Sequence, residues 1–147
     1  MPASKSPTDV LVVSDDVVVV ESHPCVELTA GMARYLLAIL DLSEGDQRPS
    51  QSSLSRHLEV SAPTTSEAIG RLRSLGLVEP DAIALTVAGT SAALVLRSRR
   101  VAAYELVRDV LGIAGADADA EAERLAFSAS PLLGRGLVAW RARRQHG

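Results

Sequence analysis

The chain has few of the residues that build covalent or metal-held scaffolds. Its single cysteine, Cys25, excludes an intrachain disulfide framework and a cysteine-rich metal cage. Aromatic residues make up only 3% of a chain that is 47% hydrophobic, so its core must consist mainly of Leu, Val, Ala and Ile. Such a core favours helices that meet through aliphatic stripes.

Long apolar runs are also missing. No run reaches the roughly 18 residues of a membrane span, and the first residues lack the pattern of a secretory signal peptide. These absences predict a cytoplasmic protein without a membrane partner. Charge is distributed unevenly: residues 1–47 carry two basic and eight acidic side chains, whereas residues 48–147 carry thirteen basic and ten acidic ones. This indicates a charged face on a molecule whose net charge is −3.

The first 28 residues read as a leader followed by a β-hairpin. Two β-branched runs in DVLVVSDDVVVVE flank Ser14, Asp15 and Asp16, which predicts a turn there before the break at Pro24. A helix then follows over residues 29–42, because apolar residues recur at helical spacing. A second, short helix follows Pro49.

The stretch SAPTTSEAIGRLRSLGLVE, residues 61–79, predicts a turn, a third helix and the first strand of a hairpin. Ile69, Leu72 and Leu75 are expected to face inward, and Gly76 is expected to end the helix. Three helices and a hairpin in this order predict a winged helix-turn-helix domain over residues 29–87. The exposed face of the third helix, where a major groove would be read, is expected to carry Thr65, Glu67, Gly70, Arg71 and Ser74.

Residues 88–147 read as a helical dimerisation domain. One long helix is predicted over residues 88–111, with an apolar stripe that includes Val110 and Leu111. After a glycine-containing break, Asp117 is expected to cap the next helix, and Ser130 with Pro131 to open the last one. Apolar faces so far from the first core need a partner, which predicts an isologous homodimer. The expected fold is therefore mostly α.

Four sequence blocks carry a resemblance to a known family. They are YLLAILDLSEGD, HLEVSAPTTSEAIGRLRSLGLVE, LTVAGTSAA, and RSRRVAAYELVRDVLGI running into DADAEAERLAFSAS. Over about residues 33–140 their order and spacing resemble the diphtheria toxin repressor family of metal-dependent repressors, which includes a manganese-responsive branch. The resemblance implies a dimeric winged-helix transcription factor, a repressor by function, that binds double-stranded DNA when a divalent metal is loaded.

The metal residues implied by the resemblance are mostly replaced in this chain. Of these positions, only Glu123 keeps a family ligand type, with Asp119 as a substitute ligand. A carboxylate pair without imidazole or thiolate is a poor site for manganese, iron or zinc. No cofactor is therefore expected. The other family ligand positions fall on Arg34, Arg100, Tyr104, Ala126 and Phe127.

Two replacements by arginine suggest a substitute for the metal. An arginine cannot lose its proton to bind a metal. Arg34 or Arg100 is therefore expected to pair with Glu123, so that a guanidinium stands where the metal cation stood. The alternatives are that the pocket has decayed and these residues are solvated, or that His23, Cys25, Glu21 and Glu27 form a relocated metal site.

The family pattern also implies a set of DNA contacts. Small hydroxyls and backbone N–H groups at the start of the third helix would hold phosphates, and Glu67 falls on a base-reading position. Glutamate can accept a hydrogen bond from cytosine N4; it can also cap the helix or pair with Arg71. The wing, the hairpin after the third helix, has a short acidic turn at Glu79, Pro80 and Asp81. These acids would weaken binding to phosphates, unless the basic C-terminal WRARR segment reaches the DNA and restores the lost affinity. The expected DNA-binding residues are Arg48, Ser52, Ser61, Pro63, Thr64, Thr65, Ser66, Glu67 and Arg71.

Three functions remain open from the sequence. The first is a DNA-binding regulator whose metal control is absent or altered. The second is a winged-helix module that binds a protein, which the acidic wing favours, and the third is a sensor of an organic anion seated at Arg34 and Arg100. An enzyme is not expected, because the chain lacks a glycine-rich phosphate loop and a histidine–carboxylate cluster at ligand spacing.

Overall fold

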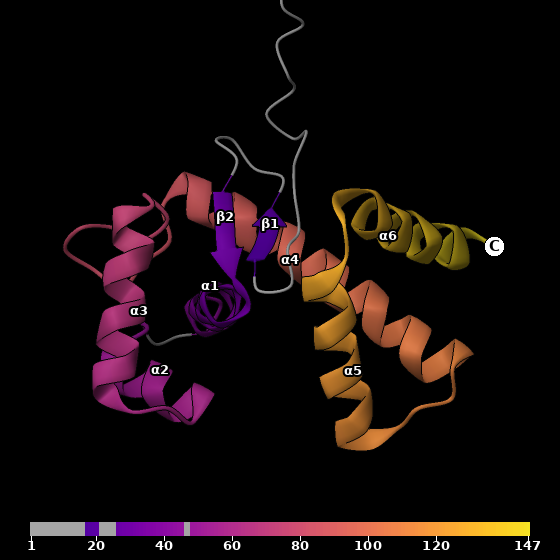
Figure 1. Cartoon of the computed structure of the whole chain (residues 1–147), viewed down its shortest axis with the longest axis horizontal. Helices are drawn as coiled ribbons and strands as arrows, with labels where there is room; N and C mark the ends of the chain where they lie inside the picture. The colour runs from indigo at the N-terminus through magenta and orange to yellow at the C-terminus, as the bar shows by residue number, and fades with distance from the viewer. Residues whose placement is uncertain (1–16, 21–25, 46–47) are drawn as a thin grey trace, which may run out of the picture.

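The computed structural model describes residues 17–20, 26–45 and 48–147. Over these ranges the fold is mostly helical, as predicted (Figure 1). In chain order the elements are β1 (Val17–Val20), β2 (Val26–Thr29), α1 (Ala30–Ser43), α2 (Gln51–Leu58), α3 (Ala62–Ser74), α4 (Val87–Glu105), the π-helical turn η1 (Leu106–Val110), α5 (Gly115–Ser128) and α6 (Pro131–His146).

The described N-terminal strands form one hairpin. Strands β1 and β2 pair antiparallel, with Val17 opposite Thr29 and Val20 opposite Val26, so the connection spans residues 21–25. The strand predicted over residues 17–20 is confirmed, and its partner strand over residues 26–29 was not predicted. The short VELT run supplies this second strand. Residues 14–16 themselves lie outside the described residues.

Helices α1, α2 and α3 each begin at a hydroxyl cap. The side chains of Thr29, Ser50 and Ser61 accept hydrogen bonds from backbone N–H groups three residues later, which satisfies part of each helix N-terminus. At the end of α3, Gly76 adopts a positive φ of 74°, a conformation that glycine adopts at little cost. The predicted starts of α1 and α2 and the stop after α3 are thus confirmed.

The wing after α3 is a minimal β-ladder. Val78 and Leu85 form a single antiparallel bridge, and the backbone N–H of Glu79 donates to the carbonyl oxygen of Ala84 at 2.8 Å. The side chains of Leu77 and Val78 on its first strand are buried. One residue of the predicted inner face of α3 is misplaced: Leu75 is 42% exposed, because it caps the helix end beside the turn at Gly76.

The C-terminal helices depart from the prediction at two boundaries. Helix α4 ends at Glu105 and continues as the π turn η1, and Val110 and Leu111 of the predicted apolar stripe are 58% and 60% exposed. Helix α5 begins at Gly115, so Asp117 lies in its first turn and caps nothing. A carboxylate there still interacts favourably with the positive end of the helix dipole. The start of α6 at Ser130 and Pro131 is as predicted.

Helix α4 connects the winged-helix unit with the C-terminal helices. It packs against α1 on one side and against α5 and α6 on the other (Figure 1). The core runs continuously through this contact, from Leu36 and Ile39 of α1 to Leu96 and Ala103 of α4 and Ala122 of α5. The orientation of α3 therefore depends on how α1 sits on α4 and α5. None of the helices in the described part of the chain is long and apolar enough to cross a membrane.

Candidate nucleic-acid interface and interhelical ion pairs

The start of α3 presents a row of small hydroxyl groups. Ser61 Oγ and Thr64 Oγ1 lie 2.7 Å apart, and Pro63 occupies the first turn, where its missing N–H leaves no helical hydrogen bond unmade. Gln51 Nε2 of α2 donates to the carbonyl oxygen of Ala62 at 3.1 Å, which ties the two helices across their turn. The exposed residues here include Ser61, Pro63, Thr64 and Ser66.

Eight of the nine sequence-predicted DNA contacts are exposed, and Thr65 is the exception. It is fully buried, and its hydroxyl lies 2.8 Å from Ser55 Oγ of α2. The Thr65 hydroxyl thus links α3 to α2 by a hydrogen bond, and its buried side chain is not accessible to DNA. The sequence reading failed because hydroxyl residues occupy four positions between Ser61 and Ser66, and only the packing of α2 decides which one turns inward.

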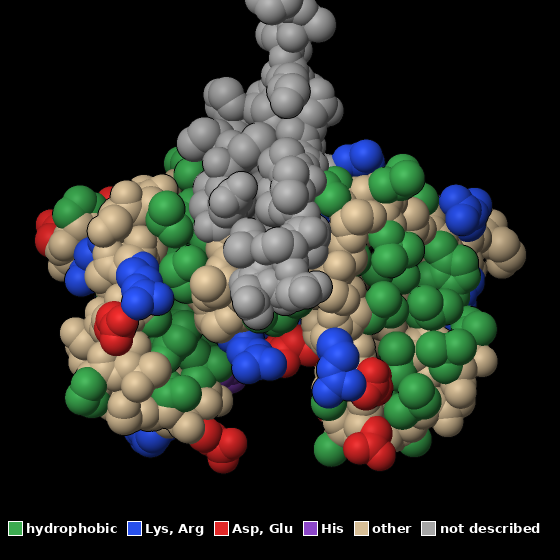
Figure 2. Space-filling model, in the orientation of Figure 1, with side chains coloured by type: hydrophobic (Ala, Val, Ile, Leu, Met, Phe, Trp, Pro, Cys, Tyr) green, Lys and Arg blue, Asp and Glu red, His purple; other side chains and the backbone are tan. Residues whose placement is uncertain are grey.

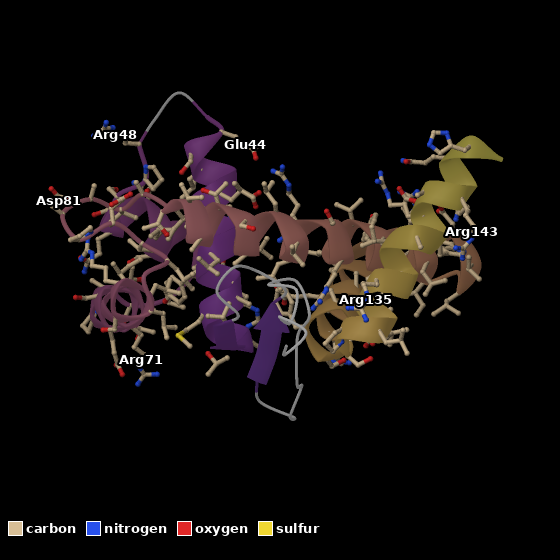
Figure 3. All side chains as sticks on the ribbon, turned by 90° about the horizontal axis from the view of Figure 1, so that it is seen from above. Glu44, Arg48, Arg71, Asp81, Arg135 and Arg143 are labelled. Carbon is tan, nitrogen blue, oxygen red and sulfur yellow. The ribbon has the colours of Figure 1, made fainter. Side chains whose placement is uncertain are left out.

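Farther along α3, a charged pair lies on the exposed face. Arg71 Nη2 donates to Glu67 Oε1 at 2.6 Å, one helical turn apart. Both side chains are open to solvent, Arg71 by 62% and Glu67 by 66%. Between them is Gly70, where an added Cβ would meet nothing within 4 Å. Figure 3 shows Arg71 at the same end of the molecule as Asp81 of the wing.

Three ion pairs connect the winged-helix unit to the C-terminal helices. Arg34 of α1 approaches Glu123 of α5, with Nη2 2.8 Å and Nε 3.0 Å from Oε2. At the other end of α1, Arg100 Nη2 of α4 lies 3.5 Å from Asp41 Oδ2. Arg97 of α4 also pairs with Glu44, the C-terminal cap of α1.

The structure brings together Arg34 and Glu123 of the predicted set, whereas Arg100 pairs with Asp41 instead of Glu123. The partners Asp41 and Glu44 were missed by the sequence reading. A signal was present: the two acids and the arginines Arg97 and Arg100 are each spaced three residues apart, which places each pair on one helix face.

The remaining family ligand positions do not assemble a metal site. Asp119 and Glu123 line a surface cavity of about 560 Å³ between α4 and α5, together with Arg100 and Tyr104. Among the described residues, no three His, Cys, Asp or Glu side chains gather closely enough to hold a metal ion. The donor set does not fit a divalent transition metal, since one carboxylate is already held by Arg34.

The other predicted residues near this site have different positions. Ala126 and Phe127 are buried in the core and offer no donor atom. The alternative metal residues Glu21, His23 and Cys25 lie outside the described residues, and only the backbone of Glu27, in β2, is described.

A second cluster of charges joins η1 to the end of α6. Arg108 Nε donates to Asp109 Oδ1 at 2.6 Å, and Arg144 Nη2 lies 2.9 Å from Asp109 Oδ2. The hydrogen bond from Arg108, together with the charge of Arg144, lowers the pKa of Asp109 below its ordinary value. The arginines also lie over Tyr104 and Trp140, each 5.2 Å from the ring centroid.

The basic C-terminal segment is remote from α3. Figure 1 places α6 at the opposite end of the molecule from α3, and Figure 3 shows Arg143 far from Arg71. The WRARR segment therefore cannot compensate for the acidic wing of the same chain. Arg141 and Arg144 of this segment pair with Glu105 and Asp109 instead.

The three N-terminal helices, their tight turn and the wing define a winged helix-turn-helix protein that carries a helical C-terminal region. A family model, the iron-dependent repressor N-terminal DNA-binding domain, matches residues 27–81. The iron-dependent repressor IdeR of Mycobacterium leprae (strain TN) is 30% identical over 107 residues, which cover 71% of this chain and 46% of that protein.

Two solved structures extend this similarity. A manganese-dependent transcriptional repressor in complex with manganese is 32% identical, with a TM-score of 0.66 over 74% of this chain and 51% of the other. The manganese regulator SloR is 26% identical, with a TM-score of 0.69 over 76% and 53%. The chain belongs to the diphtheria toxin repressor family, as its sequence blocks indicated. It spans about half the length of these relatives, which are regulators and not enzymes.

Proposed function

We propose that the protein is a homodimeric transcriptional repressor that binds double-stranded DNA through α3 and does not depend on a bound metal. The observation that carries this proposal is the exposed N-terminal turn of α3, where the hydroxyl groups of Ser61, Thr64 and Ser66 face solvent. Groups of this kind hold phosphates and fix the register of a recognition helix in the major groove. Arg48, Ser52 and Arg71 are also exposed and can add contacts.

Dimerisation is supported by the apolar surface of the C-terminal helices. Leu132 and Leu133 of α6 are 74% and 48% exposed, and Val110 and Leu111 at the end of η1 are more than half exposed. Figure 2 shows hydrophobic side chains gathered on this side of the molecule. A surface of this kind favours a second copy of the chain, because two-fold dimers bury the same patch on both subunits.

The proposed loss of metal control rests on the ion pairs between the two units. The Arg34–Glu123 pair links α1 to α5 at positions that the family resemblance assigns to metal ligands. The pairs Arg100–Asp41 and Arg97–Glu44 hold the other end of α1 on α4. Each exposed pair contributes only about 0–1 kcal/mol. Placed at both ends of α1, however, they oppose its rotation on the C-terminal helices and so hold α3 in one orientation.

The alternative of an organic-anion sensor has less support. Its proposed seat requires the charges of Arg34 and Arg100, and these face Glu123 and Asp41. The cavity beside them also contains Asp119, so the acidic groups there repel an anion. A protein-binding module remains the competitor, since Glu79 and Asp81 make the wing acidic.

The first test is selection of bound fragments from a GC-rich genomic DNA pool, in chelator and in parallel with manganese, ferrous iron or zinc. We expect a palindromic site to be enriched in chelator. Enrichment only with metal would contradict metal independence and direct mutagenesis to His23 and Cys25. No enrichment in any arm would refute DNA binding and favour the protein-binding module.

The ion-pair argument has its own test. Arg34→Glu and Glu123→Arg should each weaken DNA binding, whereas the double variant restores a pair of reversed polarity and should recover part of the affinity. Glu121→Gln is the matched control, because Glu121 pairs with Arg124 within α5 and links no two helices. Equal affinity in wild type and both single variants would show that the pair has no role in operator binding.

A further inference from the structure

The exposed face of α3 contains a glycine that the fold of the chain does not need. Gly70 lies in the helix interior, where glycine lowers helix stability relative to alanine. At Gly89 and Gly134 an added Cβ would strike neighbouring atoms, so packing explains those two glycines. At Gly70, as at Gly136 of α6, the added Cβ would meet nothing within 4 Å, and of these two open helix positions only Gly70 lies on the candidate DNA-binding face of α3. The missing side chain instead leaves space for something that approaches α3 from outside.

Gly70 lies between the two charged residues of the same face. Glu67 precedes it by three residues and Arg71 follows it directly, and their side chains pair at 2.6 Å. With both side chains more than 60% exposed, the pair is weak and separates easily when better partners are offered. In the free protein, this pair neutralises the charge of Glu67. The exposed face of α3 therefore does not repel the phosphates of an approaching duplex.

The two side chains match the two halves of one base pair. In the major groove, cytosine offers its N4 amino group as a donor, which suits a glutamate, and guanine offers O6 and N7 as acceptors, which suit an arginine. An A·T pair also offers an amino donor at adenine N6 and an acceptor at thymine O4, but only guanine offers the two adjacent acceptors that an arginine can bind with both arms. Glutamate in particular meets only acceptors on guanine, which is unfavourable.

We propose that Glu67 and Arg71 exchange their mutual ion pair for a C·G base pair, and that Gly70 allows the close approach of α3 that this exchange requires. This inference rests on the proposed DNA-binding function and specifies part of the operator. Each half-site then contains a cytosine opposite Glu67 and a guanine opposite Arg71.

The test is selection of operators from random duplexes by wild type, Glu67→Gln and Arg71→Ala. Wild type should prefer cytosine at one half-site position by about tenfold or more. Glu67→Gln should shift that position to adenine, because an amide pairs with adenine N6 and N7. Arg71→Ala should still select the same C·G pair through Glu67, but with a weaker preference over the other base pairs, because one of the two contacts to that pair is lost.

A second variant tests the close approach separately. Gly70→Ala should raise the thermal midpoint of unfolding and lower operator affinity about tenfold, an opposite response that a purely structural glycine cannot give. Gly31→Ala is the control, since its added Cβ meets only Thr29 Oγ1 at an ordinary 3.7 Å near the start of α1. It should leave operator affinity unchanged.

The outcomes separate this inference from the function on which it rests. If wild type selects no DNA, the proposed function fails and the base assignment fails with it. If wild type selects an operator but Glu67→Gln keeps the same base, only the base assignment is wrong. If Glu67→Gln binds every DNA sequence more tightly than wild type by the same factor, Glu67 only repels phosphate. That result would overturn the proposal that Glu67 contacts a base. Unchanged affinity in Gly70→Ala overturns the close approach.

Discussion

Substitution of Gly89 by alanine should destabilise the junction between the wing and α4. An added Cβ would overlap the carbonyl oxygen of Leu77 and lie 2.9 Å from its carbonyl carbon. This backbone cannot move away alone, because the Leu77 side chain is fully buried and its carbonyl oxygen accepts from the Thr86 N–H at 3.0 Å. The hydroxyl of Thr86 also donates to Gly76, which fixes the turn after α3.

The size of the effect follows from two opposing contributions. Overpacking a rigid site costs about 1–3 kcal/mol, with the upper part of the range appropriate to a backbone obstacle. Alanine recovers up to about 1 kcal/mol in helix propensity. The net loss is about 1–2 kcal/mol, or a fall of about 3–8 °C in the thermal midpoint for a chain of this length.

The assay is thermal and urea unfolding followed by circular dichroism at one fixed protein concentration, because the stability of the proposed dimer would depend on concentration. Gly70→Ala is the control, since it adds the same methyl group to a helix in open space and should gain stability. If Gly89→Ala unfolds at the same midpoint as wild type or above it, the close contact between α4 and the wing does not exist.

Three further predictions concern other contacts. Gly134→Ala should be less stable than Gly136→Ala in the same helix by about 1–3 kcal/mol, as measured by urea unfolding, because only its Cβ would come within 2.5 Å of Arg99 Nε. Thr65→Val should lose about 1 kcal/mol of stability by leaving the Ser55 hydroxyl unpaired, and a loss of DNA affinity with unchanged unfolding would instead make Thr65 a DNA contact. The lowered pKa of Asp109 gives stability that is present above its ordinary value of 3.8 and is lost as the pH falls through the folded value. The free energy of unfolding of wild type should therefore exceed that of Asp109→Asn at neutral pH, and this difference should disappear in strong acid. Urea unfolding at a series of pH values measures it.

Local signals in the sequence were enough to place most of the elements. The start of the last helix at Ser130 and Pro131 and the stop at Gly76 are set within a few residues, so predicting them needs no knowledge of the fold. The order of helices and wing, and the family blocks, then identified the architecture. The strand at residues 26–29 and the π turn after α4 were not predicted, because pairing and packing with distant segments override local preference there.

The candidate site was less predictable than the fold. Spacing along one helix can bring Glu67 and Arg71 together, and the structure shows that pair. Whether Thr65 faces DNA or α2 depends on a rotation of α3 that a neighbouring helix sets. Likewise, the sequence offered two arginines as partners of Glu123, and only the packing of α1 against α4 and α5 decided between them.

By itself, the sequence determined the helical class, the winged helix-turn-helix order and the loss of most family metal ligands, because these follow from residue identity and local spacing. Only the tertiary structure decided that Arg34 reaches Glu123 across 89 positions of sequence. It also decided that Arg100 turns to Asp41 and that Thr65 is withdrawn from the reading face. The physical reason is that an ion pair or hydrogen bond between helices requires two side chains within about 3–4 Å, and helix packing alone sets that distance.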